Sequence, residues 1–179
     1  MDYTKGKRMS GKILVVTGNG KGKTTYALGL CIKAAGAGKK VFLSQFIKGG
    51  EYSEIKALKR LDDLIVVEQF GRGRFIEGVP HPEDRMDAQK GLERVAAILK
   101  TNAFDLVVLD EANVAIKYNL FSIGDLLAAI RNRATGISVV VTGREAHPDM
   151  IESADEAIEM KEIKHYFNAG VPARVGIEK

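Results

Sequence analysis

Residues 13–25 constrain the fold of this chain more than any other part of the sequence. An apolar run over residues 13–17 is followed by a glycine-rich stretch over residues 18–22, by Lys23, Thr24 and Thr25, and by a helical pattern over residues 26–35. A strand, a glycine-rich loop and a helix in this order form a phosphate-binding loop, in which backbone N–H groups and the positive end of the helix converge on an anion. The pattern predicts an α/β protein that binds a phosphorylated ligand; the alternative is a glycine-rich turn without a ligand.

The loop is one residue shorter than the usual pattern. Thr17 occupies the position where the usual spacing places the first glycine, and the first glycine is Gly18. We expect Lys23 to contact the terminal phosphates, while the Thr24 hydroxyl binds Mg²⁺. The residues expected to bind the phosphorylated ligand are Gly18, Asn19, Gly20, Lys21, Gly22, Lys23, Thr24, Thr25 and Arg144.

Composition limits the alternatives. The chain has 179 residues, a net charge of +4 and one cysteine, Cys31. Its length predicts a single domain over residues 1–179, with residues 1–11 as a flexible N-terminal segment. One cysteine excludes an internal disulfide framework and is typical of a reducing cytoplasm. The basic residues form no dense stripe and no apolar run could span a bilayer, so we expect neither a nucleic-acid partner nor a membrane.

Strand and helix patterns alternate along the chain. Near-continuous apolar runs indicate buried parallel strands, and segments with helical periodicity lie between the expected strands. The expected strands cover residues 13–17, 41–46, 64–69, 106–110, 138–142 and 157–162. The expected helices cover residues 24–37, 53–61, 82–100, 122–133 and 148–153. This order predicts an open, mostly parallel sheet with helices on both faces, in the recombinase-like form of the P-loop NTP-binding fold, and ligands at the carboxyl ends of the strands.

Carboxylates and cationic side chains follow two of these strands. Asp110 and Glu111 end the fourth strand, where a carboxylate can bind Mg²⁺ directly or through water. Arg144 and His147 follow the fifth strand. Arg144 contacts a phosphate or forms a structural ion pair, and these alternatives remain open, whereas His147 is expected to position the turn before Pro148. We therefore expect Thr24, Glu111 and Asp110 to form the metal site.

Two glycine-containing stretches, residues 46–51 and 70–80, follow the second and third strands. Both should lie on the same sheet edge as the phosphate-binding loop, where a second substrate would dock. The C-terminal residues 163–178 mix aromatic, glycine and charged residues without a helix or strand period. A tail of this composition is expected to wrap over another part of the molecule.

Taken together, the motifs resemble the P-loop type of ATP:corrinoid adenosyltransferase, from about Lys12 to the end of the chain. The resemblance is carried by residues 17–25, Gln45-Phe-Ile-Lys-Gly49, Val108-Leu-Asp-Glu111, Thr142-Gly-Arg-Glu-Ala-His-Pro148, residues 164–170 and residues 176–178. The short phosphate-binding loop is similar to the form that this family has.

The resemblance implies a reaction and its participants. The family transfers the 5′-deoxyadenosyl group of ATP to Co(I) of a reduced corrinoid, which is cobalamin or an earlier intermediate such as cob(I)yrinic acid a,c-diamide, and releases triphosphate. Because Co(I) is the nucleophile, no catalytic base is needed. The resemblance implies that residues 18–25 and Arg144 bind ATP, and that Lys23 acts in catalysis by neutralising charge on the leaving group. The family also implies Mg²⁺, a homodimer and a separate reductant, for which a flavoprotein is a candidate.

One stretch departs from the family pattern. Relatives often carry two aromatic residues after the third strand, where this chain has Arg74 and Ile76, with Phe75 one place away. We expect Arg74, Phe75 and Ile76 to lie on the corrinoid side. The main alternative function is a recombinase-like P-loop ATP hydrolase, in which Glu111 would activate water; a small-molecule kinase and a nucleotide-dependent switch are further alternatives.

Overall fold

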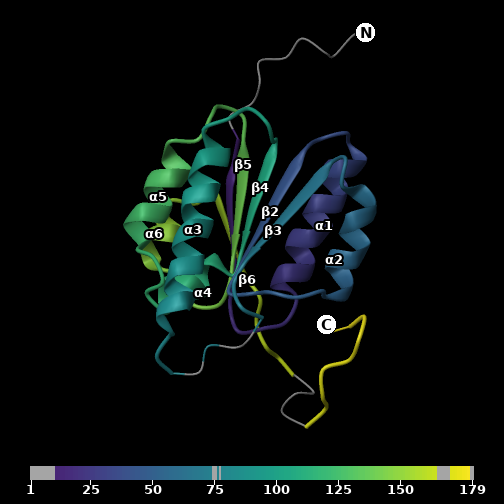
Figure 1. Ribbon diagram of the computed structural model, residues 1–179, viewed down its shortest axis with the longest axis vertical. Helices are drawn as coiled ribbons and strands as arrows, with labels where there is room; N and C mark the ends of the chain where they lie inside the picture. The colour runs from purple at the N-terminus through teal and green to yellow at the C-terminus, as the bar shows by residue number, and fades with distance from the viewer. Residues whose placement is uncertain (1–10, 74–75, 77, 165–169, 178–179) are drawn as a thin grey trace.

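The fold is an open, entirely parallel β-sheet between two layers of helices (Figure 1). The computed structural model describes residues 11–73, 76, 78–164 and 170–177. The strands are β1 (Ile13–Thr17), β2 (Val41–Phe46), β3 (Ile65–Phe70), β4 (Leu106–Asp110), β5 (Ser138–Thr142) and β6 (Glu156–Glu159). Their order across the sheet is β3-β2-β4-β5-β1-β6. The strand that precedes the phosphate-binding loop, β1, is therefore separated from the acidic strand β4 by β5.

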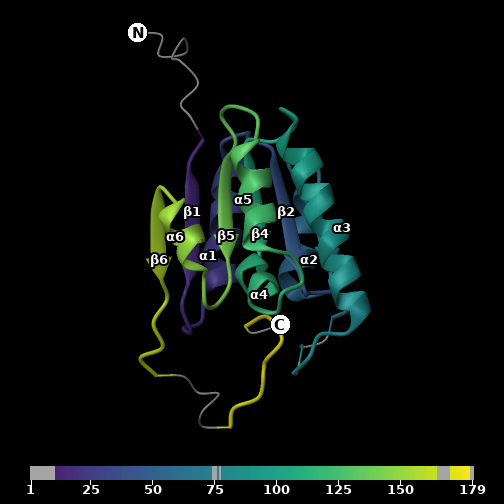
Figure 2. The ribbon, with the colours of Figure 1, turned by 90° about the vertical axis from the view of Figure 1, so that its left-hand side faces the viewer.

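Helices cover both faces of the sheet (Figures 1 and 2). One face carries α1 (Lys23–Gly36) and α2 (Ser53–Leu58), which continues into a short 3-10 turn, Lys59–Leu61. The other face carries α3 (Pro82–Leu99), α4 (Ala112–Lys117), α5 (Ile123–Arg131) and α6 (Pro148–Glu152). This two-layer cover lets every central strand bury both of its faces.

Strand β4 shows why the central strands are continuous apolar runs. Val107 and Leu109 belong to the apolar cluster on the side of α3 and α5, whereas Leu106 and Val108 belong to the cluster beneath α1. Successive strand residues point to opposite faces, so a strand covered on both sides must be apolar at every position. All five residues of β4 are buried, including Asp110 at its end.

The predicted fold class is confirmed, and most of the predicted elements lie within two residues of those observed. One predicted strand was wrong in extent, and one observed helix was not predicted. The sixth strand ends at Glu159 rather than at residue 162, because Met160 turns to bond with the phosphate-binding loop. Helix α4 was not predicted, since six residues directly after a strand are too few to show helical periodicity.

The carboxyl ends of β1, β2, β4 and β5 bring the candidate functional segments to one edge of the sheet. The predicted flexible segment, residues 1–11, lies outside the described residues except for Gly11, whose carbonyl accepts a 2.9 Å hydrogen bond from Arg133. In the described part of the chain, no helix is both long enough and apolar enough to cross a membrane.

Candidate active site

The phosphate-binding loop is held against the segment that follows β6. The Gly20 N–H donates a 2.6 Å hydrogen bond to the Met160 carbonyl. A Cβ atom on Gly18 or Gly20 would lie 2.4 or 2.6 Å from the same carbonyl oxygen. Gly18 and Gly22 also have φ values of 97° and 111°, which favour glycine. The glycines therefore provide close packing and left-handed turns as well as access to backbone N–H groups.

Lys23 is the first residue of α1, and its side chain folds back across the loop. Its Nζ donates hydrogen bonds to the carbonyls of Gly18 and Gly20, at 2.8 and 2.7 Å. Burial lowers the pKa of Lys23 below its ordinary value, and the attraction of Glu111 opposes that change. The ammonium group therefore lies inside the loop, and Lys23 lines the cavity above it.

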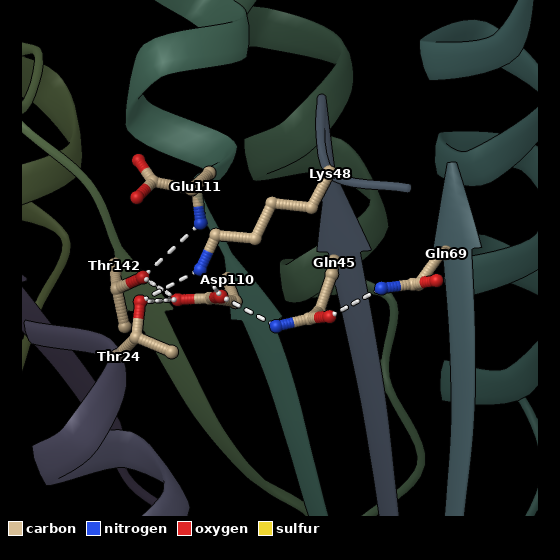
Figure 3. Close-up of polar contacts among 7 residues, drawn as sticks. All are labelled: Thr24, Gln45, Lys48, Gln69, Asp110, Glu111 and Thr142. Atoms are coloured by element: carbon tan, nitrogen blue, oxygen red, sulfur yellow. Dashed lines mark hydrogen bonds and ion pairs between the residues drawn. The ribbon is translucent and has the colours of Figure 1, made fainter. Parts of the chain in front are cut away.

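Asp110 is the anchor of the site. Its carboxylate is fully buried and accepts four side-chain hydrogen bonds (Figure 3). The hydroxyls of Thr24 and Thr142 donate to Oδ1, at 2.9 and 2.7 Å. Gln45 and Lys48 donate to Oδ2, at 3.0 and 2.8 Å. The carboxylate thus joins α1, β2 and β5 at the end of β4.

Lys48 belongs to this site, although the sequence did not single it out. Its Nζ donates to the Thr24 hydroxyl at 2.9 Å and forms an ion pair with Asp110. Burial opposes the charge of Lys48, but the carboxylates of Asp110 and Glu111 outweigh burial and raise the pKa of the ammonium group. The available signal was a lysine in a glycine-containing loop after β2, on the expected ligand edge.

Glu111 follows Asp110 with a left-handed backbone, at φ 61°, and begins α4. Its N–H donates to the Thr142 hydroxyl at 3.1 Å, while its carboxylate points away from Asp110 in Figure 3. Burial, followed by the nearby charge of Asp110, raises the pKa of Glu111. The turn thereby separates the two carboxylates: Asp110 holds the framework, and Glu111 faces the ligand cavity.

Two glutamines connect Asp110 to the loops after β2 and β3. Gln69 donates a 2.9 Å hydrogen bond to Gln45, whose own amide group donates to Asp110 (Figure 3). The Gly50 N–H donates to the Gln69 carbonyl at 3.2 Å. A Cβ atom on Gly49 would lie 2.4 Å from the Gly71 oxygen, so the two loops pack backbone against backbone. The loops after β2 and β3 are thus connected to the same carboxylate as α1.

A cavity of about 630 Å³ lies over the phosphate-binding loop. Its volume is in the range of small-molecule sites. The cavity is lined by the phosphate-binding loop, the start of α1 and α2, and residues from the loops after β2, β4 and β5 and from the C-terminal segment. These residues are Gly20, Lys21, Gly22, Lys23, Thr24, Thr25, Leu28, Lys48, Ser53, Glu54, Glu111, Arg144, Gly176 and Ile177. Gly176 and Ile177 of the C-terminal tail line this cavity, although the described tail residues 170–177 are exposed, and Figure 1 shows the tail in yellow below α1 and α2. That the tail wraps over another part of the molecule stays a prediction.

Most of the predicted ligand residues lie at this cavity, whereas Ile76 is not among the residues that line it. Arg144 is exposed and lines the cavity. Ile76 packs against the apolar cluster of the α3 and α5 face, and its carbonyl accepts a hydrogen bond from Tyr118. Arg74 and Phe75 lie outside the described residues. His147 caps α6 by accepting from the Asp149 N–H, in agreement with its predicted role in the turn.

The residues present fit magnesium better than a transition metal. Across the described ranges, no group of three or more His, Cys, Asp or Glu side chains is arranged to hold a metal ion. Mg²⁺ prefers oxygen donors and is usually bound through one or two carboxylates together with substrate phosphates. Thr24 and Glu111 supply hard oxygen donors at the cavity, and Asp110 orients the Thr24 hydroxyl.

The parallel sheet, the strand–loop–helix unit and the acidic end of β4 define a P-loop nucleotide-binding protein. The fold is similar to that of the flagellar accessory protein FlaH from Methanocaldococcus jannaschii, with a TM-score of 0.58 and 15% identity, over 84% of this chain and 71% of that one. The family described as ATP:corrinoid adenosyltransferase BtuR/CobO/CobP matches residues 9–178. The chain belongs to this family and is a transferase, so the predicted membership is confirmed.

Curated relatives agree with this assignment. A corrinoid adenosyltransferase from Pseudomonas aeruginosa is 39% identical, over 94% of this chain and 83% of that protein. One from Escherichia coli K12 is 33% identical, over 94% and 85% respectively. The corrinoid adenosyltransferase CobA of Salmonella typhimurium is also 33% identical over the same shares. These relatives support the transferase reading and not the ATP hydrolase alternative.

Proposed function

We propose that this protein transfers the 5′-deoxyadenosyl group of ATP to the cobalt of a Co(I) corrinoid. The cobalt electron pair attacks carbon 5′, a Co–C bond forms, the C5′–O bond breaks, and triphosphate leaves with the bonding electrons. The observation that carries this proposal is a cationic cavity over the phosphate-binding loop in a chain that belongs to the family over residues 9–178.

The cavity suits a reaction that needs positioning and charge stabilisation. Backbone N–H groups of the loop, together with Lys23 and Arg144, bind the triphosphate. These groups stabilise the negative charge that develops on the leaving group, because preorganised donors and cations act strongly at a buried site. Holding ATP and corrinoid in line supplies the remaining acceleration.

Magnesium neutralises charge on the triphosphate when it is bound. Thr24 and Glu111 are the residues of this chain that would hold it, and Asp110 would fix Thr24 in the required orientation. Burial and the charge of Asp110 raise the pKa of Glu111 in this structure, and a bound cation would lower it again by stabilising the ionised carboxylate.

The corrinoid docks on the loops after β2 and β3. They lie on the ligand edge, they pack on each other through Gly49 and Gly71, and they are joined to Asp110 through Gln45 and Gln69. The corrinoid-side assignment of Arg74, Phe75 and Ile76 is part of this proposal. From the family resemblance we also infer a homodimer in the cytoplasm, whose corrinoid substrate is reduced to Co(I) by electrons from a flavoprotein.

An anaerobic assay with ATP, Mg²⁺ and chemically reduced corrinoid tests the function. Adenosyl transfer predicts loss of the Co(I) absorbance that requires both ATP and protein. Hydrolysis of ATP at the same rate with and without corrinoid would instead indicate the hydrolase alternative. Nucleotide binding without any turnover would indicate a switch.

A further inference from the structure

Lys48 occupies the position in which a cation is expected to bind. Its ammonium group lies between the Thr24 hydroxyl, at 2.9 Å, and the Asp110 carboxylate, at 2.8 Å (Figure 3). Both partners are oxygen atoms, and both residues belong to the predicted magnesium site. Lys48 also lines the cavity over the phosphate-binding loop.

The charge balance of the site explains this position. Asp110 is fully buried, and a buried carboxylate without a counter-charge is strongly destabilising. Lys23, the first residue of α1, instead donates hydrogen bonds to the carbonyls of Gly18 and Gly20. Lys48 is therefore the residue that the structure pairs with Asp110.

The backbone directs Lys48 into the site. Ile47, the preceding residue, has a φ of 65°, a conformation that is unusual for a β-branched residue. Its N–H donates to the Phe70 carbonyl at 3.1 Å, which holds the turn against the end of β3. Because of this turn, the Lys48 side chain returns across the sheet edge toward β4 rather than toward solvent (Figure 3).

We propose that Lys48 is a positioning residue that stands in for Mg²⁺ in the nucleotide-free protein and leaves when metal and triphosphate bind together. The proposal rests on the triphosphate site of the proposed function. A lysine has a long, flexible side chain, so its ammonium group can move from Asp110 to a phosphate oxygen in the same cavity. Metal and triphosphate should then each increase the affinity of the protein for the other, because both favour the state in which the Lys48 ammonium group has left Asp110.

The proposal is tested by metal binding rather than by turnover. Mn²⁺ binding is measured by equilibrium dialysis and electron paramagnetic resonance, with and without inorganic triphosphate. Wild-type protein without triphosphate should bind Mn²⁺ at least about tenfold more weakly than Lys48→Met, in which Asp110 has lost its ammonium partner. Lys59→Met is the matched control, because Lys59 pairs with Glu51 on the surface and its loss changes the net charge equally.

The outcomes separate the possibilities. A folded Lys48→Met variant that binds Mn²⁺ no more tightly than wild type would overturn the proposal, and so would an equal gain in Lys59→Met. Lys48→Arg keeps a cation and should still exclude Mn²⁺; tight binding by that variant would also count against it. If Lys48→Met does not fold, tight Mn²⁺ binding by triphosphate-free wild type would be decisive against it. Failure of wild type to bind triphosphate at all would contradict the proposed function instead.

Discussion

The Asp110 carboxylate accepts a 2.9 Å hydrogen bond from the Thr24 hydroxyl, and this contact fixes the first turn of α1 to the end of β4. The hydroxyl expected to face magnesium is thereby oriented by a residue that is itself fully buried. The two adjacent acidic residues consequently have different tasks. Asp110 maintains the geometry of the site, while Glu111 is available to a ligand in the cavity.

Replacing Lys23 with alanine should lower turnover by about 100- to 1000-fold while the fold survives. The reason is the loss of a preorganised charge beside the developing triphosphate anion. Steady-state adenosylation rates and circular dichroism provide the measurements. Lys33→Ala, near the exposed end of the same helix, is the control and should keep normal activity. Near-normal turnover of Lys23→Ala would remove this residue from the catalytic site.

Glu111→Gln and Asp110→Asn should have different effects. Glu111→Gln should raise the Mg²⁺ concentration needed for activity, with little change in stability. Asp110→Asn should destabilise the fold by about 1–3 kcal/mol, because four donors face the carboxylate and an amide offers them only one acceptor atom. Denaturant unfolding and magnesium titrations of both variants distinguish these effects. An unchanged metal requirement in Glu111→Gln would exclude its metal role.

Two glycine substitutions should change stability in opposite directions. Gly71→Ala should destabilise by about 1–3 kcal/mol and slow corrinoid adenosylation, since its Cβ would lie 2.2 Å from the Ile47 carbonyl carbon. Gly29→Ala, in α1, meets nothing within 4 Å and should stabilise by about 0.5–1 kcal/mol through higher helix propensity. Thermal or denaturant unfolding measures both. Equal tolerance at the two positions would contradict the close packing of the loops.

Cys31 should be unreactive in the folded protein. Burial raises the pKa of its thiol to about 12, from an ordinary value of 9.0. The unfolded chain therefore ionises first, and the Cys31 contribution to stability is complete below pH 9.0 and declines as pH rises from 9.0 toward 12. Labelling by a thiol reagent at pH 8 should occur only on unfolding. Cys31→Ala should lose less stability than wild type between pH 8 and 10; rapid native labelling would contradict this account.

The local patterns of the sequence were enough to predict the sheet and the loop. The apolar run before Gly18 and the run that ends in Asp110 each specify a buried strand that leads to a predicted ligand-binding segment. Side-chain contacts between residues that are far apart in the sequence were not predictable in the same way. Lys48 contacts Thr24 and Asp110, which are 24 and 62 positions away in the chain, and no local period signals such contacts.

The same limit applies to the glutamines and to α4. Gln45 and Gln69 are polar residues inside apolar strands, and only the parallel register of β2 and β3 places them side by side. Helix α4 begins at the left-handed Glu111, a backbone conformation that sequence periodicity does not report. The roles of the loop residues, Arg144 and the metal ligands stay predictions until variants are measured.

The most direct measurement of the central claim is the identity of the phosphorus product. Phosphorus NMR is recorded on an anaerobic mixture of protein, ATP, Mg²⁺ and Co(I) corrinoid, and the corrinoid absorbance is followed in the same sample. The account predicts triphosphate in an amount equal to the Co(I) consumed, and no reaction of ATP when the corrinoid is omitted. Formation of ADP and phosphate, with the Co(I) absorbance unchanged, would contradict it.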